Sequence, residues 1–219
     1  MFAVSRYDQI EQLEKEKKYN HLIMVLLVRP GKDITKEIIT DFDYLHYRSG
    51  ASIAIYAAGY TNDFDHAYEV NYREVTTCNG STWYYSAKDF DDFRNNLAKR
   101  VKSWKYSGDI ELLVFQGSVV EDNGFDFRNY ISLNISYGLK HNFISSFSSF
   151  MELVIDYTER ALNERTDMLT PNGKLKVRPI IESAIENCND TSISVKKIVK
   201  NRHFYKLPSS TSAITPKNR

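Results

Sequence analysis

The sequence predicts an α/β fold with a mixed sheet, built on a parallel βαβ unit with an added antiparallel hairpin and a small C-terminal helical extension. The run HLIMVLLV at 21–28 is apolar after its first residue and is closed by an Arg-Pro-Gly turn. Such a run is typical of a strand buried on both faces. A helical pattern over 35–48 and a second apolar run over 52–58 follow. This spacing indicates two parallel strands joined by a right-handed crossover.

The hairpin is predicted from Asn79-Gly80, which lies between an alternating stretch at 69–77 and the run TWYY at 82–85. Asn-Gly between two β-prone runs favours a type I′ turn, because both central residues of that turn need a positive φ. We therefore expect an antiparallel ribbon attached to the parallel unit.

The other elements follow from periodicity. A surface helix is expected over 5–18, with a thin apolar stripe formed by Tyr7, Ile10 and Leu13. A second helix begins at the capping residue Ser86 and carries a clear apolar stripe, formed by Phe90, Phe93, Leu97, Val101 and Trp104. Further predicted elements are a strand over 110–115, a strand or a helical turn over 130–137, a long helix over 142–163, and short helices over 179–187 and 194–203.

A dense turn cluster at 170–173 (TPNG) marks the expected boundary between two parts of the chain. Residues 1–169 form the predicted α/β core domain, which includes the surface helix 5–18. Residues 170–206 form a basic helical extension, and 207–219 form a disordered tail.

Composition narrows the class of protein. The 219 residues carry a formal net charge of +1 and are 42% hydrophobic, which is typical of a soluble globular protein. No run approaches the length of a membrane helix, and 1–7 lacks the basic-then-apolar layout of a secretion signal. Cys78 and Cys188 are far apart and have no metal or redox spacing. We therefore expect a cytoplasmic protein with free thiols and no membrane contact.

One candidate catalytic pair lies on the helix predicted over 35–48. Asp43 and His46 are three residues apart, so the carboxylate is able to orient the imidazole. His46 also falls between Phe42 and Ile39 on the helical wheel, which favours a buried, hydrogen-bonded histidine. Both interpretations stay open at this point.

A candidate metal site follows from the acidic loops. In an open parallel sheet, ligands bind beyond the carboxyl ends of the strands, where we expect the loops at 29–34, 59–66 and 116–124. The candidate ligands in these loops are Asp33, Asp63, Asp65, His66 and Glu121. If they converge, they would hold Mg²⁺ or Mn²⁺ for a metal-dependent phosphoesterase or nuclease, the only interpretation that implies a cofactor. The competing interpretation is that acids gather in loops because loops are wet.

The segment 29–35 joins a strand to a helix N-terminus, a geometry in which backbone amides are able to hold a phosphate. It lacks the second glycine and the Gly-Lys-Ser/Thr ending of a Walker loop. These residues favour an ordinary tight turn.

The C-terminal segment 191–219 has a strong charge asymmetry. It has seven basic residues and no acidic one, so the rest of the chain must carry −6 to give the net +1. On the helix over 194–203, Val195, Ile198 and Val199 are placed to dock on the body, and the candidate partner-binding residues point outward: Lys196, Lys197, Lys200 and Arg202. We therefore expect a binding or regulatory module, without a catalytic motif, that contacts a protein or nucleic-acid partner through a basic arm. The alternatives are that the arm neutralises the acidic body or is a solvated tail, and that the protein is the metal-dependent enzyme described above.

Overall fold

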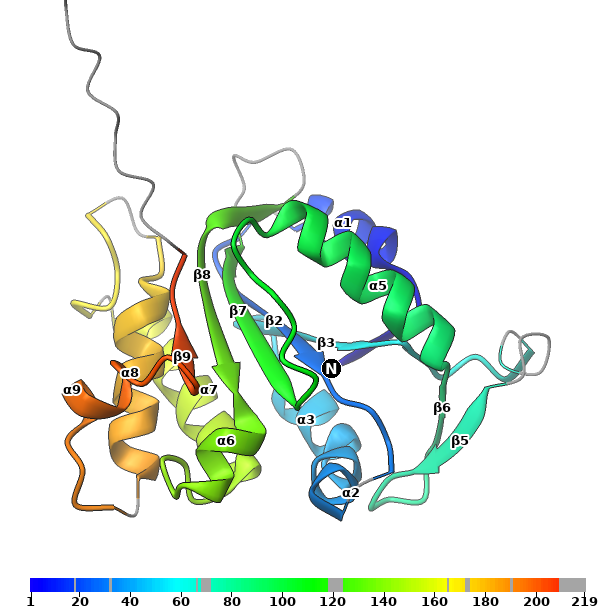
Figure 1. Cartoon of the computed structure of the whole chain (residues 1–219). Coiled ribbons are helices and arrows are strands. Elements are labelled where there is room, and N and C mark those ends of the chain that lie inside the picture. Colours follow the sequence, from blue (N-terminus) through cyan, green and yellow to red (C-terminus); the bar gives the residue numbers. More distant parts are fainter. Residues whose placement is uncertain are drawn as a thin grey trace, which may run out of the picture.

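The computed structural model describes residues 1–17, 19–31, 33–65, 67, 72–117, 124–164, 166–171, 174–189 and 191–208. Its centre is a six-stranded mixed sheet with the strand order β1-β3-β2-β7-β8-β9 (Figure 1). The strands are β1 (Phe2–Val4), β2 (Leu22–Leu27), β3 (Ile53–Ala58), β7 (Glu111–Gly117), β8 (Phe125–Asn134) and β9 (Tyr205–Lys206). β1, β3 and β2 are parallel, whereas β7, β8 and β9 each run antiparallel to the preceding strand in the sheet. The predicted fold class is confirmed.

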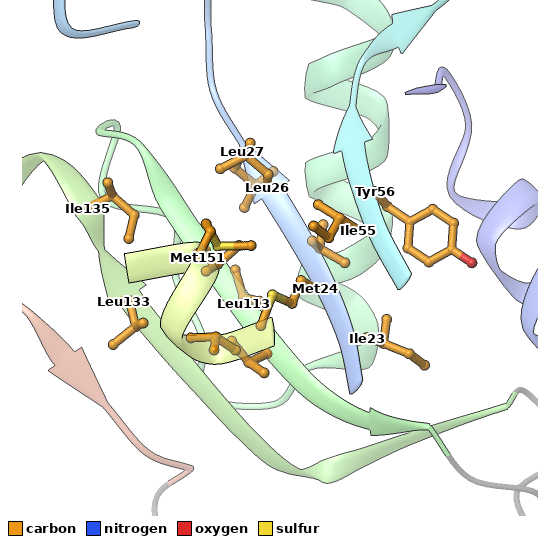
Figure 2. Close-up of a cluster of buried hydrophobic side chains, with 14 of the residues drawn as sticks. Ile23, Met24, Leu26, Leu27, Ile55, Tyr56, Leu113, Leu133, Ile135 and Met151 are labelled. Atoms are coloured by element: carbon orange, nitrogen blue, oxygen red, sulfur yellow. The ribbon is translucent and has the colours of Figure 1, made fainter. Parts of the chain in front are cut away.

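The two strands of the predicted βαβ unit lie at the centre of the core. Every residue of β2 and β3 is buried. Figure 2 shows Met151 of α7 near the apolar side chains of β2, and the strand register places Met24, Leu26 and Leu133 on one face of the sheet and Leu113 on the other. Because both faces of these strands are covered, their sequences are continuously apolar and do not alternate.

Helices cover both faces of the sheet (Figure 1). On one face lie α1 (Tyr7–Lys15) and α5 (Ala87–Arg100). On the other face α3 (Phe42–Arg48) lies beside α7 (Phe147–Glu164), and α8 (Val177–Cys188) packs against α7, β7 and β8. The remaining helices are α2 (Asp33–Thr40), α6 (Ile135–Lys140) and α9 (Val195–Ile198). Among the described residues, no helix is both long and apolar enough to cross a membrane.

The predicted hairpin is present, and it belongs to a second, three-stranded antiparallel sheet. This sheet has the order β4-β6-β5 and consists of β4 (Tyr60–Thr61), β6 (Thr82–Tyr85) and β5 (Arg73–Thr76). The turn is not type I′. Gly80 donates its amide to the Thr77 carbonyl and has φ +77, and Asn79 is not among the residues with positive φ. The loop is therefore the longer kind in which only one glycine is left-handed.

Several element boundaries differ from the predicted ones. The helix predicted over 35–48 is divided at Asp41 into α2 and α3. β8 ends at Asn134, whose side chain accepts a hydrogen bond from the Tyr137 amide and so begins α6. The helix predicted from residue 142 begins at Phe147. Only 195–198 of the predicted helix 194–203 is helical, and the edge strands β1 and β9 were not predicted.

The C-terminal segment is part of the core packing. Ile198 and Phe204 are fully buried in the same cluster as the central strands. Tyr205 pairs with Leu133 of β8, so the chain adds a strand to the main sheet. The tail predicted from Leu207 onward lies outside the described residues, except for Leu207 and Pro208.

Candidate functional site

The four predicted partner-binding cations are all exposed. Lys196 and Lys197 lie on α9, and Lys200 and Arg202 lie in the turns that follow it. Ile198, fully buried, anchors this segment on the body, with Val195 and Val199 partly buried beside it. The side of the segment that carries the charges is therefore fixed by its apolar residues.

A groove of about 700 Å³ lies where this segment crosses β8. Among the described residues that line it, Lys200, Arg202 and Lys206 are basic and none is acidic. The remaining lining residues are Ser103, Trp104, Tyr130, Val199, Tyr205, Leu207 and Pro208. The groove thus joins three parts of the chain: the turn after α5, the middle of β8, and the segment around β9.

The turn that carries Arg202 is held by Asn201. The side-chain amide of Asn201 donates to the Tyr137 hydroxyl over 3.3 Å, and its carbonyl oxygen accepts the His203 amide over 3.0 Å. The Phe204 ring fits against Gly138, where an added Cβ would stand 2.5 Å from Phe204 Cε2. Arg202 is therefore presented on a rigid turn and not on a loose arm.

The floor of the groove is also ordered. The Tyr130 hydroxyl lies 3.4 Å from Ser103 Oγ and donates to the Lys102 carbonyl over 3.4 Å. Ser103 has φ +67, a conformation that costs energy for a residue other than glycine and that recurs at functional sites. The Trp104 indole donates to Glu111, which is fully buried and also accepts the Ser107 amide. Both oxygens of that carboxylate are therefore used inside the protein.

The groove has an unbalanced positive charge. Lys200, Arg202 and Lys206 form no ion pair with any described residue. Arg48 provides the contrast, since its guanidinium contacts three carboxylates of α7. Burial raises the pKa of Tyr205, whose hydroxyl donates to Glu182 on α8. The two acids next to the lining, Glu111 and Glu182, contact Trp104 and Tyr205, and neither forms an ion pair with the three cations.

The predicted catalytic residues Asp43 and His46 have separate partners in the structure. Asp43 is buried and accepts hydrogen bonds from the Thr77 hydroxyl and, over 3.3 Å, from the Trp83 indole. It thereby ties α3 to the hairpin. His46 Nδ1 lies 2.6 Å from the Met1 carbonyl oxygen and 3.3 Å from the Met1 amino group. Asp43 and His46 thus hold α3 to two different segments, the hairpin and the N-terminus.

The predicted metal ligands can be placed only in part. Asp33 is exposed and pairs with Lys36, and the exposed Asp63 accepts the Asp65 amide. His66 and Glu121 lie outside the described residues. Within the described part of the chain, no group of three or more His, Cys, Asp or Glu residues is arranged to hold a metal ion.

The predicted metal site assumed that the loop after β7 lies at the same edge of the sheet as the loop after β2, and the direction of β7 contradicts this. Because β7 runs antiparallel to β2, its last residue, Gly117, donates to the His21 carbonyl beside the start of β2. The chain therefore leaves β7 at the opposite edge of the sheet from the turn that follows β2. The segment 116–124 does not start at the carboxyl edge where 29–34 lies.

A buried ionic cluster was missed by sequence reasoning. The Glu14 side chain is completely buried on α1 and contacts Lys17, His21 and the Tyr56 hydroxyl. Figure 2 shows Tyr56 extending from β3 toward the N-terminal segment. In the sequence, Glu14 belongs to the run EKEKK, which is typical of a solvated helix face, so no signal distinguished it.

Comparison with known protein families finds no family whose model matches this chain, and neither curated proteins nor solved structures give a significant match. Function must therefore be argued from the residues themselves.

Proposed function

We propose that the protein is a binding module whose basic groove holds the phosphate backbone of a nucleic-acid strand. The observation that carries the proposal is a set of three cations, Lys200, Arg202 and Lys206, that within the described part of the chain form no ion pair and share their groove with no carboxylate. Lys and Arg without protein partners gain most from phosphates, because binding releases the counterions of the nucleic acid. A groove lined by several such residues suits a polyanion better than a single small acid.

The aromatic residues of the groove support backbone contacts and not base reading. The exposed fractions of Trp104, Tyr130 and Tyr205 are 4%, 3% and 3%. Their faces are therefore not free for base stacking. Contacts to phosphates position a strand without reading its sequence, so we expect weak sequence preference.

The proposal places the module in the cytoplasm. Cys78 and Cys188 are both free thiols, with Cys78 exposed. Free, exposed thiols suit a reducing compartment.

The test is the salt dependence of binding to a fluorescein-labelled single-stranded oligonucleotide of mixed sequence, followed by fluorescence anisotropy. The full-length protein should bind at low salt, with affinity that falls steeply as salt rises. The Lys200→Glu, Arg202→Glu double variant should bind about tenfold or more weakly, and its log-log salt slope should be smaller by roughly 1.4, about 0.7 for each lost phosphate contact.

The matched control is the Lys88→Glu, Lys140→Glu double variant, which makes the same change in net charge at exposed residues outside the groove. If the two double variants bind equally, general charge attraction explains the binding. If the wild-type protein binds no oligonucleotide at low salt, the proposal is overturned. In that case an acidic protein partner becomes the interpretation to test.

A further inference from the structure

A second cluster of cations lies at the end of β2, away from the groove. Arg29 follows this strand, and its guanidinium lies 4.6 Å from the centre of the Phe90 ring. The same guanidinium pairs with Asp91 over 2.6 Å, and Arg94 pairs with Asp91 over 3.3 Å. One carboxylate is therefore shared by two arginines.

Tyr85 supplies the feature that these contacts do not explain. Its hydroxyl is buried and has no hydrogen-bond partner among the residues that the structure describes, and the residue is 7% exposed. The neighbouring Tyr60, whose ring centre is 5.1 Å away, donates its hydroxyl to the Val28 carbonyl over 3.1 Å. A buried hydroxyl without a partner is costly and rare, so this group is a candidate hydrogen-bond donor to a bound molecule.

The Tyr85 hydroxyl is a hydrogen-bond donor at neutral pH. Burial raises the pKa of Tyr85 to about 12, and the nearby Arg29 charge opposes this shift. The hydroxyl therefore keeps its proton. Tyr85 is paired with Arg73 across β5 and β6, and its ring centre lies 6.1 Å from that of Phe90, the ring on which Arg29 stacks.

Arg73 completes the cluster from the second sheet. Arg73 is exposed, and its guanidinium makes no hydrogen bond or ion pair with any described residue. Its Nη1 lies 3.9 Å from the position that a Cβ on Gly31 would occupy, so it stands over the turn after β2. Arg29 and Arg94 thus share one carboxylate, whereas Arg73 stands over the neighbouring turn without an acidic partner among the described residues.

The position is the one at which open parallel sheets bind ligands. β2 and β3 are parallel, and the turn after β2 leads into α2. The region beyond the carboxyl ends of such strands is the general ligand site of this architecture. An anion here would meet excess positive charge together with a buried donor.

We propose that Arg29, Arg73 and the Tyr85 hydroxyl form a binding site for the phosphoryl group of a small phosphomonoester. Guanidinium groups hold phosphate oxygens through paired, charge-assisted hydrogen bonds, and the tyrosine hydroxyl gives a further neutral donor. On binding, the Arg29 guanidinium moves from Asp91 to the phosphoryl group, while Arg94 stays paired with Asp91. The site shares no residue with the lining of the basic groove.

The test is titration with inorganic phosphate and, separately, with phenyl phosphate, measured by isothermal calorimetry at constant ionic strength in chloride. Wild-type protein should bind both probes with one site. Arg73→Gln should weaken binding about tenfold, since it removes one charge-assisted contact at an exposed position. Tyr85→Phe should weaken binding without lowering the melting temperature of the free protein, because the hydroxyl it removes has no partner.

The Lys200→Glu, Arg202→Glu variant separates this proposal from the groove. Phosphate binding that survives this variant and falls in Arg73→Gln and Tyr85→Phe supports the site. Binding that is lost in the groove variant and unchanged in the other two overturns the site and leaves the groove proposal standing. The proposal is also overturned if the wild-type protein binds no phosphate. It is overturned as well if Tyr85→Phe lowers the melting temperature, since the hydroxyl would then be bonded to a water.

Discussion

Glu14 and His21 form a buried ion pair in which the carboxylate Oε2 lies 2.5 Å from the imidazole Nε2. The other ring nitrogen of His21 lies 3.0 Å from the Tyr19 carbonyl oxygen, which only accepts. With a charged Glu14, both ring nitrogens of His21 therefore face acceptors. Lys17 Nζ, 2.7 Å from Glu14 Oε1, adds a second cation. The pair joins α1 to the beginning of β2.

The ion pair predicts a loss of stability in acid. Burial by itself raises the pKa of Glu14, but hydrogen bonds from His21, Lys17 and Tyr56 and the His21 charge outweigh it, so the pKa lies below its usual value. A carboxylate with a lowered folded-state pKa stabilises the fold above its unfolded-state pKa, and this contribution is lost as the pH falls through the folded-state value. We expect the free energy of unfolding, measured in urea, to drop below about pH 4.5.

Glu14→Gln tests the origin of that acid dependence. The variant removes the buried carboxylate that Lys17, His21 and Tyr56 all contact, so it should lower the free energy of unfolding at pH 7 by about 3–5 kcal/mol. Its stability should also vary less between pH 3 and 5 than that of the wild type. An equal acid slope in both proteins would show that other carboxylates cause the dependence.

Gly117 provides a steric test of the same cluster. An alanine Cβ at this position would lie 2.5 Å from His21 Cε1, and the imidazole is held by hydrogen bonds on both sides. Gly117→Ala should therefore cost about 1–3 kcal/mol of stability. Gly50→Ala is the control, since an added Cβ there meets nothing within 4 Å. Similar unfolding midpoints for the two variants would contradict a rigid His21.

The fold was predictable where one stretch of sequence contains the whole signal. β2 and β3 have uninterrupted apolar runs, and α5 has both its serine cap and its apolar stripe. β1 and β9 contain three and two residues, too few for any periodicity. The direction of β7 depends on how the chain returns to the sheet after α5, which no local pattern records.

Of the candidate site, only the wall formed by the C-terminal segment was predictable from the sequence. The spacing of Val195, Ile198 and Val199 already implied which side of the segment meets solvent. The opposite wall, formed by Ser103 and Trp104, is nearly a hundred residues away in the sequence and meets the arm only through tertiary packing. The partners of Glu14 were also hidden, because His21 lies just before β2 and Tyr56 on β3, and both meet α1 only through tertiary packing.

The central strands give a prediction with an internal contrast. Leu26 is fully buried on β2, so Leu26→Asp should prevent folding, since an unpaired buried carboxylate costs several kcal/mol, comparable with the stability of a whole domain. Leu13 was expected on the buried stripe of α1 but is 37% exposed. Leu13→Asp should therefore change the melting temperature little. A folded Leu26→Asp protein with an unchanged melting temperature would exclude the buried central strand.

Truncation tests how deeply the basic segment belongs to the fold. Residues 191–208 contain Ile198 and Phe204, both fully buried, together with the strand that pairs with β8. Loss of one buried phenylalanine alone costs about 3–5 kcal/mol, so a protein ending at residue 190 should unfold at a much lower temperature or be insoluble.

A protein ending at residue 208 should keep the full melting temperature, since it retains every described residue. It also retains Lys200, Arg202 and Lys206, and should therefore still bind the labelled oligonucleotide with nearly the full salt dependence. If removal of 209–219 abolishes binding while the fold is intact, the contacts come from Lys217 and Arg219 in the tail and not from the groove.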